Sequence, residues 1–310
     1  MKTTLGSIFS KKSRESGKGS ISQTQALSAA LAACMGTGNI VGVAAAIASG
    51  GAGAVFWMVI SAIIGMMSAC CENILGIKYR YRDENGEWMG GAFVYMERGL
   101  GFRHMAKIFC VLLVIASLGI GNMTQANAAA LSLSGSFGLS PAITGSVLAA
   151  GVFAITCGGL KRIASAAEKI IPAMTAIFIL ASFAVIIKNF RAVPSAFSRI
   201  ISEAFRCVRR QEERRATGVK SSSATGGARS FSNEAGLGSN AIIHAAAQTD
   251  SPAEQGCWGI LEVFLDTVVM CTVTAITLLV SGARRTATAL SPAPRHSAAY
   301  SEKPGAFSSA

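Results

Sequence analysis

Charged residues are scarce in this chain of 310 residues. Asp, Glu, Lys and Arg make up 14% of it, whereas soluble domains carry about 25%. Two stretches of 53 residues, 19–71 and 108–160, contain none of these four residue types. A water-facing surface needs charge, so the sequence excludes an ordinary soluble domain. It also excludes a collagen, a disordered chain, a disulfide-stapled mini-protein and a DNA-binding domain.

Metal-binding and catalytic patterns are missing as well. The eight cysteines show no CxxC spacing, and most are interpreted as small residues that pack between helices. His104 and His244 stand singly and far apart, which argues against a haem or a metal site other than one for a transported ion. No Ser–His–Asp or paired-carboxylate arrangement stands out. We therefore expect no cofactor and no enzymatic activity.

Long apolar segments are abundant. Hydrophobic residues make up 51% of the chain and its mean hydropathy is +0.47. A helix that spans a bilayer needs about 20 apolar residues, so each uncharged stretch can hold two. We predict an all-α polytopic membrane protein with about seven transmembrane helices. The predicted spans cover residues 25–49, 54–77, 105–131, 141–160, 170–190, 231–248 and 258–281.

The basic residues fall in alternate connections between the spans. Of the 28 Lys and Arg, 14 lie in residues 1–18, 78–107 and 161–169, whereas the turns at 49–53 and 132–140 carry no charge. The positive-inside rule places the N-terminus and both basic loops in the cytoplasm. A basic groove for nucleic acid is the disfavoured alternative. We expect a multi-pass protein of the plasma (inner) membrane that contacts the lipid bilayer and no nucleic acid.

The first span contains poor helix formers at its centre, Gly36-Thr37-Gly38-Asn39. An unwound turn at this depth leaves peptide groups that need other partners. Freed carbonyls suit a cation, and the N–H groups at the start of the second half-helix suit a carboxylate. The alternative is a face of small residues for close helix packing. Thr37 and Asn39 favour the unwound turn.

The sixth span has a similar interruption. Residues 231–239, FSNEAGLGS, place an amide, a carboxylate and two glycines at the entrance of an apolar helix. Two interrupted helices at corresponding places in two halves are typical of the midplane site of a secondary transporter. An inverted repeat of five helices would produce the spacing between the first and the sixth span.

Four acidic residues lie near or within the spans: Glu72, Glu234, Glu262 and Asp266. Carboxylates in the membrane are costly and usually face a cavity or a partner. Glu262 and Asp266 share a helical face, and no Lys or Arg shares their span. A cation, a proton or hydrogen bonds from other helices could neutralise them. An ion path or structural network is thus one interpretation, and placement at the membrane interface is the other.

Several motifs together resemble those of a known family. Residues 50–58, GGAGAVFWM, followed by Ser61 and Gly65, resemble the signature of the alanine/glycine:cation symporters, also called sodium:alanine symporters. GTGNIVGVAAAIASGG, GIGNMTQAN, KRIASAAEKIIP and FSNEAGLGS resemble that family too and follow its order, although Val59 stands where the family commonly has Trp. The resemblance covers about residues 1–205 and 229–283. It implies a leucine-transporter-like fold that moves Na⁺ or H⁺ together with a small neutral amino acid, alanine or glycine.

The resemblance also implies the residues that bind substrate and ion. They are Gly36, Thr37, Gly38 and Asn39 in the first span, Asn122 and Gln125 in the third, and Phe231, Ser232 and Asn233 in the sixth. The backbone of the first group would form part of the carboxylate and sodium sites. The second group would face the substrate, although hydrogen bonding between helices explains these amides equally well. The third group would line the opposite wall.

The chain departs from the family, which normally has one more helix before the first span and at least three after the seventh. We therefore expect an incomplete fold with a cytoplasmic segment 1–24, a first five-helix repeat 25–190, an aberrant basic connection 191–230, the start of a second repeat 231–281, and a polar, disordered tail 282–310. Residues 206–230 hold seven of the 28 bases, where an apolar half-helix should lead into Phe231. A shifted reading frame or a decayed gene is the hypothesis for this segment and the tail.

Three functions therefore stay open. The first is a symporter, which this truncation could have inactivated. The second is a non-transporting remnant or structural membrane protein, and the third is a carrier of the same fold with different cargo.

Overall fold

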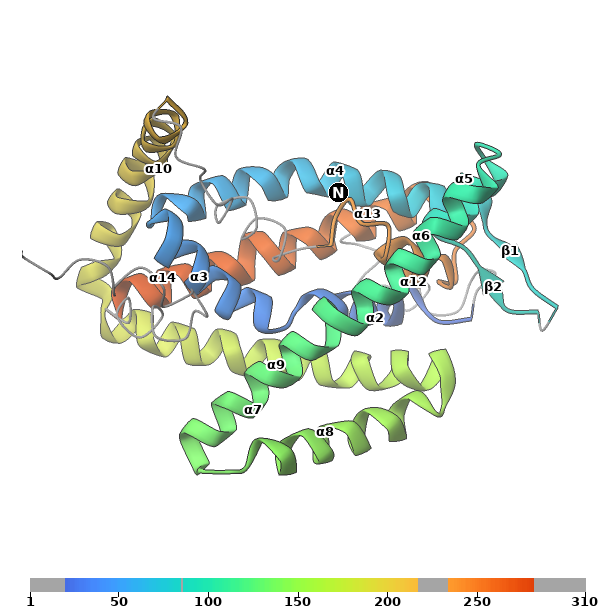
Figure 1. Cartoon of the computed structure of the whole chain (residues 1–310), viewed down its shortest axis with the longest axis horizontal. Helices are drawn as coiled ribbons and strands as arrows, with labels where there is room; N and C mark the ends of the chain where they lie inside the picture. The colour runs from blue at the N-terminus through green and yellow to red at the C-terminus, as the bar shows by residue number, and fades with distance from the viewer. Residues whose placement is uncertain (1–19, 85, 217–233, 282–310) are drawn as a thin grey trace, which may run out of the picture.

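The computed structural model describes residues 20–84, 86–216 and 234–281, and most of them are helical (Figure 1). Four helical stretches are long and apolar enough to cross a membrane: Gly53–Tyr79, Arg103–Phe137, Gly159–Lys188 and Pro252–Val280. The bent pair Gln23–Cys34 and Thr37–Gly50 adds a broken span, and Pro141–Thr156 is a shorter apolar helix. The protein is an all-α polytopic membrane protein.

The first span is interrupted where the sequence predicts. It consists of α2 (Gln23–Cys34), the 3₁₀ turn η2 (Thr37–Asn39) and α3 (Val41–Gly50), and its two halves are bent by 59°. A capping box starts α2: the Ser22 hydroxyl accepts from the Gln25 N–H, and the Gln25 side chain accepts from the Ser22 N–H. The helix stops at Met35, where ψ is 83°, and Gly36 is extended.

The long helix α4 (Gly53–Tyr79) packs along α13 (Pro252–Val263). The π-helix η5 (Phe264–Cys271) and α14 (Thr272–Val280) continue α13 to the far end of the bundle (Figure 1). Glycine permits the close approach of α4 and α13, because a Cβ atom on Gly259 would lie 2.4 Å from Nδ2 of Asn73. Small residues at a crossing are a common way for membrane helices to pack.

The polar loop after α4 contains regular structure. Strands β1 (Tyr81–Arg82) and β2 (Trp88–Met89) form an antiparallel hairpin, and α5 (Ala92–Arg98) follows. A turn joins the two strands: the Gly86 N–H donates to the Asp83 carbonyl, and Gly86 has a φ of +77°.

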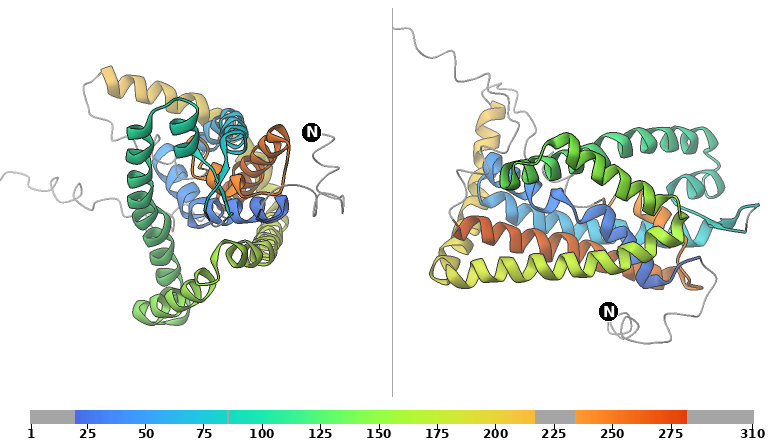
Figure 2. Two further views of the ribbon diagram at one scale, coloured as in Figure 1. Left: turned by 90° about the vertical axis from the view of Figure 1, so that its right-hand side faces the viewer. Right: turned by 90° about the horizontal axis from the view of Figure 1, so that it is seen from below.

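The third span runs through α6 (Arg103–Ala116), the π-helix η3 (Ser117–Met123) and α7 (Thr124–Phe137). It crosses the bundle obliquely, and α8 (Pro141–Thr156) connects it to α9 (Gly159–Lys188) (Figures 1 and 2). Val111 on α6 and Val147 on α8 are 59% and 67% exposed, as expected for helices in contact with lipid. The basic residues at 161–169, predicted as a loop between two spans, instead lie in the first turns of α9.

A helix occupies much of the predicted basic connection 191–230. After η4 (Phe190–Ala192), α10 (Val193–Ala216) lies across one end of the bundle (Figure 1). Ala196, Ile200 and Ala204 recur every four residues and are buried, and α10 packs against α4. Two hydrogen bonds fix it there: the Glu203 carboxylate accepts from the Ala52 N–H, and the Trp57 indole donates to the Ala204 carbonyl.

Of the predicted sixth span, the structure describes residues 234–248, where the only helix is the six-residue α12 (Asn240–Ala245). Gly236 and Gly238 have φ values of +95° and +74°, so the chain before α12 is not helical. After α12, Ala247 forms a parallel bridge with Ile21. A full span over 231–248 is therefore not seen in the described part. The predicted tail 282–310 and most of the N-terminal segment 1–24 lie outside the described residues.

Candidate functional site

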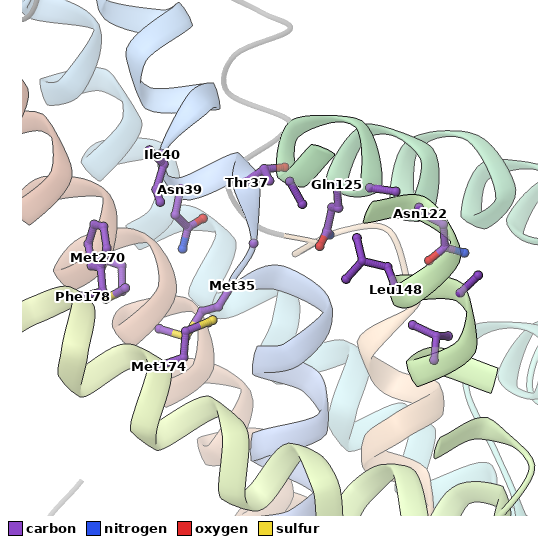
Figure 3. Close-up of a pocket in the computed structure, with 16 residues that line it drawn as sticks. Met35, Thr37, Asn39, Ile40, Asn122, Gln125, Leu148, Met174, Phe178 and Met270 are labelled. Carbon is purple, nitrogen blue, oxygen red and sulfur yellow. The ribbon is translucent and has the colours of Figure 1, made fainter. Parts of the chain in front are cut away.

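A cavity of about 630 Å³ opens beside the break in the first span. Five residues with predicted site roles line it, namely Gly36, Thr37, Asn39, Asn122 and Gln125 (Figure 3). Gly38 is not among the lining residues. Phe231, Ser232 and Asn233 lie outside the described part of the chain. The structure therefore brings the first and third spans together at one cavity.

The remaining lining is mainly apolar. It comes from the ends of the break and from α7, α8, α9 and η5, and it includes Met35, Ile40, Leu148, Val152, Met174, Phe178 and Met270. A concave site with apolar walls and a few polar groups is the usual form of a small-molecule site. The sequence alone does not distinguish these apolar residues from neighbours that face lipid.

Gln125 approaches the break very closely. A Cβ atom on Gly36 would lie 2.8 Å from Oε1 and 3.0 Å from Nε2 of Gln125. Asn122 lies in the π-helix η3, directly before the α7 helix that carries Gln125. π-Helical turns are frequent at functional sites because they change which side chains face a cavity. Both amides therefore face the same cavity, on opposite sides of the change from π- to α-helix.

Asn39, at the other end of the break, is held by η5. Its Nδ2 donates to Oδ1 of Asp266 at 2.7 Å, and the hydroxyl of Thr267 donates to Oδ2 of the same carboxylate. Asn39 and Asp266 are buried. Oδ1 of Asn39 is also buried and has no hydrogen-bond partner among the described residues, which leaves one oxygen available to a ligand.

Glu262 lies in a second buried network. Its Oε1 accepts from Nδ2 of Asn240 at 2.5 Å and from the thiol of Cys34 at 3.4 Å, and its Oε2 lies 3.1 Å from Nε2 of His244. Nδ1 of His244 in turn contacts Nε2 of Gln255 at 2.5 Å. The sequence suggested only a packing role for Cys34 and argued against a haem or metal at His244. It did not reveal this network, because the network joins residues far apart in the chain.

The other two carboxylates hold the turn before α12. Glu72 on α4 faces the backbone N–H groups of Gly236 and Gly238, and its Oε2 is buried without a hydrogen-bond partner among the described residues. Glu234 accepts from the hydroxyl of Ser239. Three of the four predicted acidic residues, Glu234, Glu262 and Asp266, therefore have hydrogen-bond partners. Glu262 and Asp266 are 1% and 0% exposed, so they lie inside the bundle.

Arg80 fixes the chain on the other side of α12. Its guanidinium donates to the carbonyls of Ala245, Ala247 and Thr249 at 2.9, 2.8 and 2.5 Å, and it stacks on the Trp88 ring with its Cζ atom 4.4 Å from the ring centroid. An arginine at the C-terminal end of a helix satisfies carbonyls that have no partner within the helix. α12 thus has a hydrogen-bonded contact at both ends, between Glu234 and Ser239 before it and from Arg80 after it.

Comparison with known proteins identifies the family. The model of the sodium:alanine symporter family matches residues 1–310. The sodium/alanine symporter AgcS of Methanococcus maripaludis is 42% identical over 278 residues, which are 88% of this chain and 61% of the relative. An uncharacterized transporter of Haemophilus influenzae is also 42% identical, over 90% of this chain and 61% of its own length.

A further relative is named for another amino acid. The probable sodium/glutamine symporter GlnT of Bacillus subtilis is 40% identical over 87% of this chain and 55% of its own length. The chain thus spans between 55% and 61% of these three relatives. The shifted-frame hypothesis for residues 206–230 and the tail stays a prediction. The matches over the whole sequence and at 42% identity show that the chain belongs to the sodium:alanine symporter family.

Proposed function

We propose that this chain acts in secondary active transport of a small neutral amino acid, alanine or glycine, coupled to Na⁺ or H⁺. The observation that carries the proposal is the cavity at the break in the first span, where Gly36, Thr37 and Asn39 meet the amides of Asn122 and Gln125. The names of the relatives support cation-coupled amino-acid transport in general. The choice of alanine or glycine rests on the motif resemblance.

The break supplies groups for the carboxylate of an amino acid and for a cation. The second half-helix, α3, starts directly after the cavity-lining residues Asn39 and Ile40. The N-terminal end of a helix carries partial positive charge and favours a carboxylate. Oδ1 of Asn39 is a neutral oxygen atom without a partner in the described residues, and hard cations prefer oxygen ligands.

The walls favour an uncharged side chain. Leu148, Met174 and Phe178 offer no polar group to a substrate, and burying an unpaired charge among them would be costly. Gln125 and Asn122 add hydrogen-bonding groups but no charge. Together these features support a neutral amino acid and disfavour an acidic or basic one.

We also propose a leucine-transporter-like arrangement and a cytoplasmic N-terminus in the plasma membrane. The 59° bend in the first span supports the arrangement. The alternation of basic and uncharged connections supports the orientation.

Uptake by the full chain in proteoliposomes tests the function. Labelled alanine and glycine are offered with an inward Na⁺ gradient, an inward H⁺ gradient or no gradient, and empty liposomes serve as control. We expect accumulation above the external concentration with one of the gradients only. Gradient-independent flux would contradict coupling and favour a carrier with different cargo or mechanism.

Binding in detergent separates transport from recognition. We expect labelled alanine to bind the purified chain, and binding to depend on the coupling cation. Alanine binding without uptake would contradict transport and favour the non-transporting alternative. Neither binding nor uptake would contradict the assignment of the cavity as the substrate site.

A further inference from the structure

A carboxylate and an imidazole meet in the interior, outside the cavity. Oε2 of Glu262 on α13 lies 3.1 Å from Nε2 of His244 on α12, and their side chains are 1% and 0% exposed. The Cys34 thiol on α2 and the Asn240 amide on α12 complete the contacts of Glu262. The pair therefore sits where α2 and α12 meet α13.

The surroundings of the pair are acidic. Glu262 interacts electrostatically with the thiol of Cys34 on α2 and with the carboxyls of Glu72 on α4 and Asp266 on η5. Glu234, before α12, acts in turn on Cys34 and Asp266. Across the described ranges, no Lys or Arg forms an ion pair with Glu262 or His244. An ionised carboxylate beside a neutral imidazole would leave one uncompensated negative charge in the interior, which is costly. One proton on the pair removes that charge, whichever of the two groups carries it.

The partner of the imidazole can adapt to either state. Nε2 of Gln255 contacts Nδ1 of His244 at 2.5 Å, which suits a neutral ring whose Nδ1 accepts. Oε1 of Gln255 is buried and has no hydrogen-bond partner in the described part of the chain. Rotation of this amide by half a turn presents Oε1 to Nδ1 and suits an imidazolium, in which both nitrogens donate. Oε1 of Gln255 is thus a buried acceptor that can hydrogen-bond to the imidazolium of His244.

We propose that Glu262 and His244 form a proton-binding site that joins α2 and α12 to α13. The site takes one proton from water onto the carboxylate–imidazole pair and returns it to water, and no other bond forms or breaks. Cys34, which donates to Glu262, is the last residue of α2 and directly precedes the cavity-lining residues Met35 and Gly36. Loss of the proton leaves a bare negative charge beside Cys34 and weakens the packing of α2 against α13. An effect of the proton on alanine binding rests on the proposed function, whereas proton binding does not.

Spectroscopy of the full chain in lipid nanodiscs tests proton occupancy. The chain has three histidines, so a His104→Gln/His296→Gln variant leaves His244 as the only histidine signal without changing the network. We expect ¹⁵N NMR near neutral pH to show an imidazolium, or infrared spectroscopy to show a protonated carboxyl band that Glu262→Gln removes. A neutral ring together with no such band would overturn the proposal.

The pH dependence of stability is a second, independent test. If the folded chain holds the proton, the folded state binds more protons than the unfolded state, and its stability falls as pH rises. Linkage of one proton changes the unfolding equilibrium constant by up to tenfold per pH unit over the range where the proton is lost. We expect Glu262→Gln to lose this dependence and Glu254→Gln, on the same helix but outside the network, to keep it. Equal dependence in wild type and Glu262→Gln would overturn the proposal.

Alanine binding as a function of pH then tests the link to the cavity. We expect the alanine affinity of the wild type to fall severalfold as pH rises through the range in which the stability measurement shows loss of the proton. The affinity of Glu262→Gln should stay constant over that range. Proton binding with pH-independent alanine affinity would overturn the link but not the proton site. Proton binding without any alanine binding would contradict the proposed function and still support the proton site.

Discussion

Gly36 and Gln125 meet across the break in the first span, where a Cβ atom on Gly36 would lie 2.8 Å from Oε1 of Gln125. The backbone of Gly36 is extended, with φ −138° and ψ −146°, so its conformation alone does not demand glycine. The contact does. The side chain that a substitution would displace is one of the two amides that face the cavity.

The first prediction concerns this contact. In Gly36→Ala the new methyl group pushes away the Gln125 amide, which is the flexible end of a side chain, so we expect the fold to survive. Alanine affinity should fall about tenfold or more, equivalent to about 1.4 kcal/mol, because the amide leaves its position and the cavity narrows. Equilibrium binding of labelled alanine to the purified protein measures the change.

Gly135→Ala is the matched control for this substitution. Gly135 lies on α7, the helix that also carries Gln125, and a Cβ atom there meets nothing within 4 Å. We expect wild-type affinity in this variant. Equal affinity in Gly36→Ala and Gly135→Ala would show that Gln125 does not contribute to the site.

The second prediction compares two variants of Asp266. Both Asp266→Ala and Asp266→Asn remove the ionisable carboxyl group, but only asparagine keeps an oxygen that accepts from Nδ2 of Asn39. Leaving a buried donor without a partner costs about 1–3 kcal/mol. We therefore expect Asp266→Ala to be less stable than Asp266→Asn by about that amount, measured by unfolding in detergent. If the two variants unfold alike, the Asn39 contact does not hold the break.

The break could be predicted from the sequence because its cause is local. Gly36 and Gly38 lie within three residues of each other beside Thr37 and Asn39, and these residues weaken a helix wherever it packs. The amides at 122 and 125 stand out for a similar reason, because polar groups in an apolar segment need partners. Both features are visible without knowledge of neighbouring helices.

The apolar wall and the buried network could not be predicted in this way. Met174 and Met270 are apolar, as residues that face lipid are. A bilayer and an apolar cavity wall favour the same side chains, so the sequence alone does not distinguish the two positions. The thiol of Cys34 and the carboxyl of Glu262 lie 228 residues apart in the chain, and only the tertiary fold brings them together. The helix α10 was also not predicted, because residues 193–216 contain many arginines. Its buried face is only the short repeat Ala196, Ile200 and Ala204.

The third prediction concerns Arg80. Replacing it by glutamine removes a charged group that donates to three carbonyls at the end of α12. A hydrogen bond to a charged group contributes about 1.5–3 kcal/mol, and the half-buried position of Arg80 reduces this. We expect Arg80→Gln to lower the unfolding free energy by about 2 kcal/mol, measured by thermal unfolding in detergent. Arg82→Gln, at an exposed position on β1, should change stability little, and an equal loss in both would contradict a specific role for Arg80.

The fourth prediction tests the crossing of α4 and α13. A methyl group at residue 259 would lie 2.4 Å from Nδ2 of Asn73 and 3.1 Å from the carbonyl oxygen of Ala69, so α4 and α13 must separate to admit it. Overpacking of this kind costs about 1–3 kcal/mol, although alanine is the better helix former by about 1 kcal/mol. In Gly151→Ala on α8, a Cβ atom meets nothing within 4 Å, so only the gain in helix propensity remains. We therefore expect opposite signs in thermal unfolding, with Gly259→Ala less stable than wild type and Gly151→Ala equal or more stable. Stabilisation by both substitutions would mean that α4 and α13 are not in close contact at Gly259.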